Sequence, residues 1–164
     1  MFGTAKKRMP QLMAILMGAG LVGVSAQGAE AQVLYLTKDR NYEVAMQAMK
    51  AGDLETAADR FERAVSFDIG SARLLPMLNN LCAVNYVLGH LDKAKEACDR
   101  AIREDRHYWR AYVNRGNVFK AEGDLKAARA DYRYAVRLAP KADLPRQALA
   151  RLDNHREQLL AGAH

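Results

Sequence analysis

Hydrophobic and small residues recur three and four positions apart along most of this 164-residue chain. That spacing is the period of an amphipathic α-helix. The helical stretches come in pairs, and a glycine lies between the two members of each pair. The pattern therefore predicts helices at residues 41–50, 54–67, 75–88, 91–104, 109–122 and 125–138.

The glycines between the paired helices mark an internal repeat. Gly123 follows Gly89 by 34 residues, and Gly52 precedes Gly89 by 37 residues. A helix often ends in a left-handed conformation that glycine adopts at little cost. Asp53 and Asp124 come directly after two of these glycines, where each is placed to cap the next helix. The middle unit has a histidine there, which is a poorer cap. Each unit is therefore predicted to be a helix, a tight turn and an antiparallel helix.

Small residues recur at three equivalent places in each unit, and they allow two helices to pack closely. A bulky substitution at such a place is expected to overpack the contact and to cost about 1–3 kcal/mol. A fourth place holds a larger residue in two units, Phe61 and Tyr132, with Cys98 in the middle unit. The small places are held by Ala45, Cys82 and Gly116, by Ala57, Ala94 and Ala128, and by Ala64, Ala101 and Ala135.

The third copy of the unit carries a recognisable series of residues, in order Tyr112, Gly116, Phe119, Gly123, Ala128, Tyr132, Ala135 and Pro140. These fall on the signature places of the tetratricopeptide repeat, and the chain resembles that family over residues 38–142. The other copies match less fully, since Asn41 stands in a large apolar place and Arg106 stands where proline is usual. The resemblance implies an all-α fold, an α-solenoid of three tetratricopeptide-like repeats plus a C-terminal capping helix. That helix and a tail are assigned to residues 143–164, starting at Asp143-Leu144-Pro145 with proline in the first turn.

The resemblance also implies a concave groove lined by the first helix of each unit. Asn80 and Asn114 are equivalent places in this lining, and an amide can donate and accept hydrogen bonds at once. We expect the groove to hold an extended peptide; the alternative is that these amides are ordinary polar surface. A carboxylate clamp known in the family is only partly matched, because Tyr42 and Met46 stand where it has lysine and asparagine. The implied lining is Tyr42, Met46, Asn79, Asn80, Ala83, Tyr86, Arg110, Val113, Asn114, Asn117 and Lys120.

The two cysteines, Cys82 and Cys98, face each other across the helix pair of the middle unit. They form no CxxC motif and no paired histidine accompanies them, which argues against a zinc site. In an oxidising compartment a disulfide between them would close a loop of about 16 residues and contribute up to about 3 kcal/mol. The alternative is two free thiols acting as small core residues.

The N-terminal segment has the features of a secretion signal. Lys6, Lys7 and Arg8 precede an uncharged apolar run at residues 12–24, and small residues follow it. Residues 1–26 are therefore predicted to be a signal peptide or signal anchor, and residues 27–37 a leader. We expect an exported bacterial protein, periplasmic or secreted after cleavage; the alternative is an inner-membrane anchor that leaves the repeats facing the periplasm.

Charge and motifs exclude several functional classes. The formal net charge is +6, half of it from the N-terminal basic residues, and no basic face suited to nucleic acid stands out. The histidines show no ligand spacing, and no catalytic constellation is present, so we expect no metal, no cofactor and no enzyme activity. The sequence favours a non-catalytic adaptor that binds a protein or extended peptide partner. The alternatives are a self-assembling structural scaffold and, less favoured, a thiol-redox protein that uses Cys82 and Cys98.

Overall fold

The structure is a computed structural model that describes residues 40–66 and 71–161. Within these ranges the chain forms helices and turns and no strand, which confirms the all-α fold class. The helices in chain order are a first helix at residues 40–51, α2 (Leu54–Val65), α3 (Ser71–Val87), α4 (Leu91–Glu104), α5 (Trp109–Ala121), α6 (Leu125–Leu138) and α7 (Asp143–Ala161).

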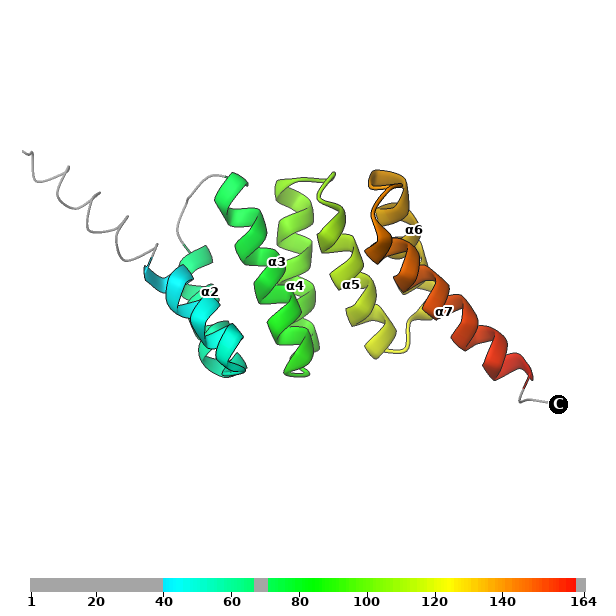
Figure 1. Ribbon diagram of the computed structural model, residues 1–164, viewed down its shortest axis with the longest axis horizontal. Helices are drawn as coiled ribbons and strands as arrows, with labels where there is room; N and C mark the ends of the chain where they lie inside the picture. The colour runs from blue at the N-terminus through cyan, green and yellow to red at the C-terminus, as the bar shows by residue number, and fades with distance from the viewer. Residues whose placement is uncertain (1–39, 67–70, 162–164) are drawn as a thin grey trace, which may run out of the picture.

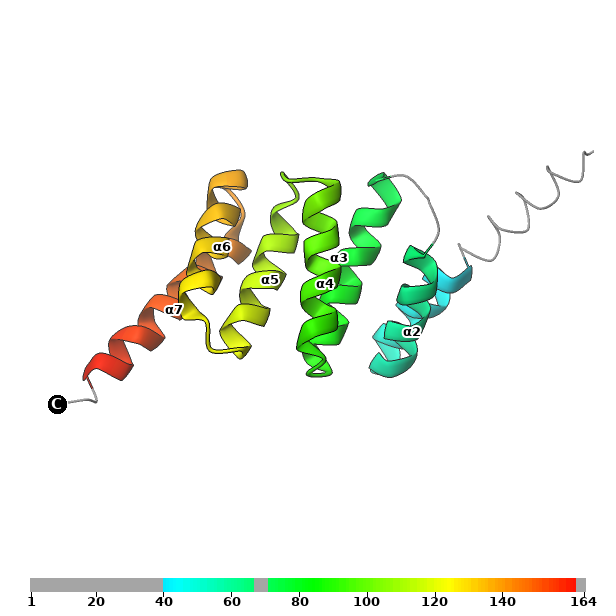
Figure 2. The same cartoon turned by 180° about the vertical axis from the view of Figure 1, so that it is seen from behind.

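The helices stack side by side in two layers, as Figures 1 and 2 show from opposite sides. The first helix, α3, α5 and α7 lie toward the viewer in Figure 1, and we call them the A layer. The B layer consists of α2, α4 and α6, which lie toward the viewer in Figure 2. The elements that contact each other are neighbours along the chain or in the stack, so the three helix pairs and α7 form the expected solenoid.

The three turns between paired helices confirm the role predicted for their glycines. Gly52, Gly89 and Gly123 have φ angles of +80°, +78° and +86°, in the left-handed region. No other described residue has a positive φ. A side chain at these places would meet no neighbouring atom, so the backbone conformation alone requires glycine.

The two aspartates cap the helices that follow them, as predicted. The Oδ1 of Asp53 accepts a hydrogen bond from the backbone N–H of Thr56 at 3.1 Å. Hydrogen bonding to the side chain of Thr56, and then to its backbone, lowers the pKa of the aspartate. The Oδ1 of Asp124 accepts from the N–H of Ala127 at 2.9 Å. His90, at the equivalent place in the middle unit, makes no side-chain cap.

The predicted small places are buried in every repeat. One of them, in the first helix of each unit, pairs with the fourth place in the second helix, and the pair differs between units. The pair is Cys82 with Cys98 in the second unit and Gly116 with Tyr132 in the third, and the equivalent residues of the first unit, Ala45 and Phe61, are both fully buried. A Cβ on Gly116 would lie 2.5 Å from the Cε1 of Tyr132, so that contact requires glycine.

The starts of two helices test the boundaries that the hydrophobic pattern predicted. α7 begins at Asp143, as expected, and buries Leu152 against the third repeat. α3 begins at Ser71, four residues before the expected start at Leu75, and contains Pro76. The predicted start followed the apolar pattern alone, and the helix extends one further turn toward its N-terminus. The predicted signal peptide (residues 1–26) and leader (residues 27–37) lie outside the described residues.

Candidate functional site

The side chains predicted to line the groove come from three consecutive A-layer helices: the first helix, α3 and α5. Contacts between them run from one repeat to the next. The Nδ2 of Asn80 lies 3.4 Å from the Sδ of Met46, and the Nδ2 of Asn114 donates to the Oδ1 of Asn79 at 2.9 Å. The set therefore forms one continuous surface across the three repeats.

The amides on this surface already hold neighbouring helices together. Besides its bond to the Asn79 side chain, the Nδ2 of Asn114 lies 3.4 Å from the backbone oxygen of Asn79, so it links α5 to α3. The Oδ1 of Asn117 accepts from the hydroxyl of Tyr132 at 2.8 Å, which links α5 to α6. The Oδ1 of Asn114 and the Nδ2 of Asn117 take no part in these bonds. The row of amides is thus partly structural, with acceptor and donor capacity left over.

The first-repeat end of the surface combines apolar side chains with the charged Glu43 and Arg73. Tyr42 is half-buried and packs on Phe61, with ring centroids 6.2 Å apart. It also lines a pocket of about 400 Å³ between the first helix and the start of α3, together with Pro76 and Met77. Val113, which the resemblance placed in the lining, is 2% exposed and belongs to the core.

The third-repeat end of the surface is cationic. Arg110 is exposed, and its guanidinium lies 4.4 Å from the ring centroid of Trp109. Lys120 lines a pocket of about 390 Å³ with Arg151 of α7 and two leucines. Arg151 was not predicted, although it lies 34 residues after Asn117 and therefore holds the equivalent place. Extending the repeat period into α7 would have found it.

Tyr132 of α6 is buried next to this surface. Burial raises the pKa of Tyr132 to about 12, and electrostatic repulsion from Tyr86 and Asp131 acts in the same direction. The Tyr132 hydroxyl stays protonated over the physiological range and serves as the donor to Asn117.

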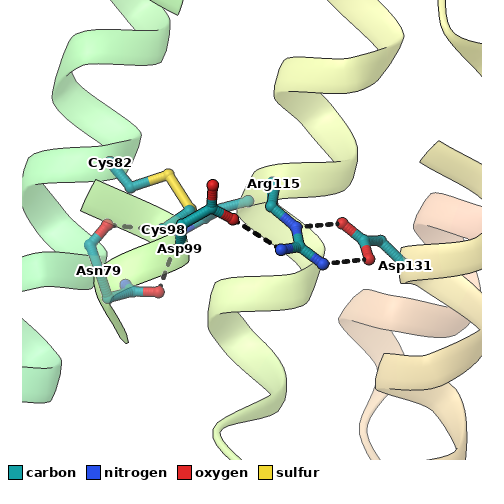
Figure 3. Close-up of a disulfide and its surroundings, with 7 residues drawn as sticks. Asn79, Cys82, Cys98, Asp99, Arg115 and Asp131 are labelled. Atoms are coloured by element: carbon teal, nitrogen blue, oxygen red, sulfur yellow. Dashed lines mark hydrogen bonds and ion pairs between the residues drawn. A yellow bond between two sulfur atoms is a disulfide. The ribbon is translucent and has the colours of Figure 1, made fainter. Parts of the chain in front are cut away.

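An ion-pair cluster that the sequence analysis missed joins the second and third repeats. Figure 3 shows Arg115 of α5 between two aspartates from the B layer. Its Nε and Nη2 donate to both oxygens of Asp131 at 2.8 and 2.9 Å, and its Nη1 donates to Asp99 at 2.6 Å. Asp131 is buried, and the bonds to the two carboxylates raise the pKa of Arg115 further above its usual range. The only signal in the sequence was an arginine at the place that Leu81 holds one repeat earlier.

Cys82 and Cys98 are joined by a disulfide, with Cα atoms 5.4 Å apart (Figure 3). Both residues are fully buried. A redox-active pair needs access to its partner thiols. The geometry therefore favours a structural cross-link over a catalytic one.

Other site classes find no support within the described residues. No group of three histidine, cysteine, aspartate or glutamate side chains is placed to hold a metal ion. None of the helices there is long and apolar enough to cross a membrane.

Comparison with known sequences supports the repeat assignment. The sequence profile described as tetratricopeptide repeat matches residues 110–141, which cover nearly all of α5, the whole of α6 and the three residues after it. The mouse protein named FK506-binding protein-like is 27% identical over 111 residues, which cover 65% of this chain and 32% of that protein. The chain thus spans about a third of the length of this relative.

Comparison with solved structures supports the fold. The tetratricopeptide domain of OM64 from Arabidopsis has a TM-score of 0.66 at 24% identity, covering 73% of this chain and 96% of that one. The first tetratricopeptide domain of Spaghetti (RPAP3), solved with the HSP90 peptide SRMEEVD, has a TM-score of 0.65 at 20% identity, covering 74% and 94%. The fold of this chain is that of a tetratricopeptide repeat domain.

Proposed function

We propose that this chain is a non-catalytic interaction module that holds an extended peptide segment of a partner protein along its A-layer face. The observation that carries the proposal is the continuity of that face across the three repeats. The contacts from Met46 to Asn80 and from Asn79 to Asn114 place polar groups in a row. A row of this kind suits an extended chain, whose backbone offers donors and acceptors at regular intervals.

The two ends of the face differ, and the difference defines the segment. The first-repeat end offers the Tyr42 pocket, where Pro76 and Met77 supply apolar surface beside Glu43 and Arg73. The third-repeat end offers Arg110, Lys120 and Arg151. We therefore propose a segment with an apolar side chain at one end and acidic side chains at the other. In the RPAP3 domain with the same fold, the bound peptide SRMEEVD is also acidic. Tyr42 and Met46 give this chain a different first-repeat end from a lysine–asparagine clamp, so we do not propose that a free C-terminal carboxylate is required.

The binding test uses peptides selected on the full chain from a random library, with dissociation constants measured by calorimetry. The groove variant is Arg110→Glu/Lys120→Glu, which reverses two exposed A-layer cations. The matched control is Arg103→Glu/Arg133→Glu, which makes the same charge change on exposed B-layer positions of α4 and α6. We expect the groove variant to bind at least tenfold more weakly and the control to bind like the unchanged chain. Equal effects of the two variants would contradict the proposal.

A separate variant tests the amide row. Asn80→Ala removes a groove amide whose described contact is the sulfur of Met46, whereas Asn114 also bridges two repeats. We expect Asn80→Ala to lower peptide affinity while the thermal unfolding midpoint changes little. Unchanged affinity would show that the amide row does not contribute to peptide binding.

We further propose that the module acts outside the cytoplasm of a bacterium, as a periplasmic or secreted adaptor. The support is the basic and apolar N-terminal segment together with a disulfide, since disulfides persist in oxidising compartments. N-terminal sequencing of the protein isolated from the periplasm would test this, with cleavage near residue 26 as the expected result. An intact N-terminus in the cytoplasmic fraction would contradict it.

A further inference from the structure

The two interfaces between successive repeats are built from equivalent residues that differ in size. Between the second and third repeats, the space between α4 and α6 is filled by Arg115, Asp131 and the Phe119 ring, which lies 5.6 Å from the guanidinium. The equivalent residues between the first and second repeats lie 34 positions earlier. They are Leu81, Ala97 and Asn85.

The smaller side chains leave a pocket of about 290 Å³ between α2 and α4, which are both labelled in Figure 2. Its base is formed by A-layer helix α3 and its walls by the two B-layer helices. It therefore opens on the face opposite to the proposed peptide groove. The lining residues are Glu62, Val65, Leu78, Leu81, Asn85, Lys93, Glu96, Ala97 and Arg100.

Asn85 is the unusual member of this lining. Its side chain is 1% exposed, and neither its Oδ1 nor its Nδ2 has a hydrogen-bond partner. A buried amide without partners destabilises the folded chain, so such a group needs an explanation. The carboxamide turns about χ2, a broad torsion, which allows both polar atoms to face an occupant of the pocket.

The hydrogen-bonding capacity of Asn85 defines the chemistry of that occupant. It has to offer a donor and an acceptor side by side. A primary carboxamide does so, whereas a carboxylate offers only acceptors and an ammonium group only donors. A trans backbone amide points its N–H and C=O in opposite directions and satisfies one atom at a time.

The rest of the lining fits the same chemistry. Two acidic and two basic side chains surround the pocket, and one pair, Glu62 and Lys93, is joined at 3.1 Å, so the charges favour a neutral group. Val65, Leu78 and Ala97 supply apolar surface for a short aliphatic stem. The volume lies at the lower limit of ligand pockets, so a single side chain fits better than a whole cofactor.

We infer that this pocket is a second binding site, which receives the side-chain carboxamide of a glutamine or asparagine from a partner protein. The site does not rest on the peptide groove, because it uses other helices on the opposite face. A partner that engages both sites would contact the two faces of the solenoid at once.

The first test is a titration of the ¹⁵N-labelled full chain with propionamide, followed by NMR. We expect saturable shifts of the Asn85 side-chain NH₂ signals and of backbone signals from α2 and α4. Propionate and propylammonium, which have the same stem, should shift them less, and so should N-methylacetamide, a trans amide. Shifts as large with a charged probe or with the trans amide as with propionamide would overturn the assignment. The absence of saturable shifts with propionamide would also overturn it.

Three variants separate the site from general stability. Asn85→Leu removes the side-chain amide. Ala97→Leu fills the pocket but leaves the Asn85 amide in place. Each variant should raise the dissociation constant of propionamide at least tenfold. The matched control Asn154→Leu makes the same substitution at an exposed position of α7, a helix that does not line the pocket, and should bind propionamide normally. Binding that survives both Asn85→Leu and Ala97→Leu would overturn the site.

The source of the carboxamide is tested with blocked amino acids. N-acetylglutamine N-methylamide should bind at least as tightly as propionamide, and the blocked alanine should bind much less. Binding of propionamide without binding of the blocked glutamine would overturn the assignment to a partner protein and indicate a free small amide.

Discussion

The disulfide between Cys82 and Cys98 occupies the place that Gly116 and Tyr132 hold in the next repeat. In both repeats the pair joins the first helix of the unit to the second. In the third repeat a large ring fills the space left by a missing side chain, and in the second a covalent bond spans the same gap. The same contact between paired helices is thus made by side-chain packing in one repeat and by a covalent cross-link in the other.

Reduction of the disulfide should lower the free energy of unfolding by up to about 3 kcal/mol, as expected for a closed loop of this length. The measurement is urea unfolding of the full chain with and without reductant. The double variant Cys82→Ala/Cys98→Ala should lose at least as much, because it also leaves a cavity.

A transplanted pair separates packing from cross-linking. Cys82→Gly/Cys98→Tyr installs the pair of the third repeat, and we expect it to be more stable than the double-alanine variant. If the double-alanine chain were as stable as the disulfide-bonded chain, the cross-link would contribute nothing.

Arg115 and Asp131 should be strongly coupled. Arg115→Leu leaves the buried Asp131 carboxylate without its partner and should cost about 3–5 kcal/mol. The double variant Arg115→Leu/Asp131→Ala reproduces the leucine–alanine pair found one repeat earlier and should recover much of this loss. Urea unfolding of the two single variants and the double variant measures the coupling. Additive losses would show that the ion pair has no such role.

The cap of α4 can be improved. His90 makes no side-chain cap bond, whereas the equivalent Asp124 accepts from Ala127. His90→Asp should raise the free energy of unfolding by about 1 kcal/mol, and Asp124→Ala should lower it by a similar amount. Thermal unfolding checks both, with His90→Ala as the control that should change little. A His90→Asp chain no more stable than His90→Ala would contradict this account of the turn.

Tyr132 should make stability fall at alkaline pH. Its pKa is about 12 in the folded chain and about 10 when unfolded, so the unfolded state loses the proton first. The contribution is fully present below pH 10 and is lost as pH rises from about 10 to 12. Chemical unfolding at several pH values measures this.

The control for the alkaline effect is Tyr132→Phe, since phenylalanine is the natural residue at the equivalent place, Phe61. This variant lacks the hydroxyl bond to Asn117 but should lose less stability between pH 10 and 12. Parallel losses in the two chains over that range would assign the effect to other groups.

The fold was largely predictable because its determinants are local. Each glycine turn, each capping aspartate and the start of α7 is defined by neighbouring residues and a fixed period. The small places in the helices follow the same period, so their burial could be predicted without knowing the packing.

The remaining features depend on contacts between repeats. An arginine at position 115 appears on its own as a polar residue in an apolar stripe, and only the packed helices bring Asp99 and Asp131 to it. Asn85 is unusual because partners are missing, which no local pattern reveals. The start of α3 was misplaced because the apolar pattern that defined the helix begins at Leu75, one turn after the first helical residue.

The most direct test of the central claim is hydrogen exchange of the full chain with and without a selected peptide. The account predicts added protection in the first helix, α3, α5 and α7, which form one face of the stack. Protection concentrated in α2, α4 and α6 would contradict it, because the peptide would then occupy the opposite face.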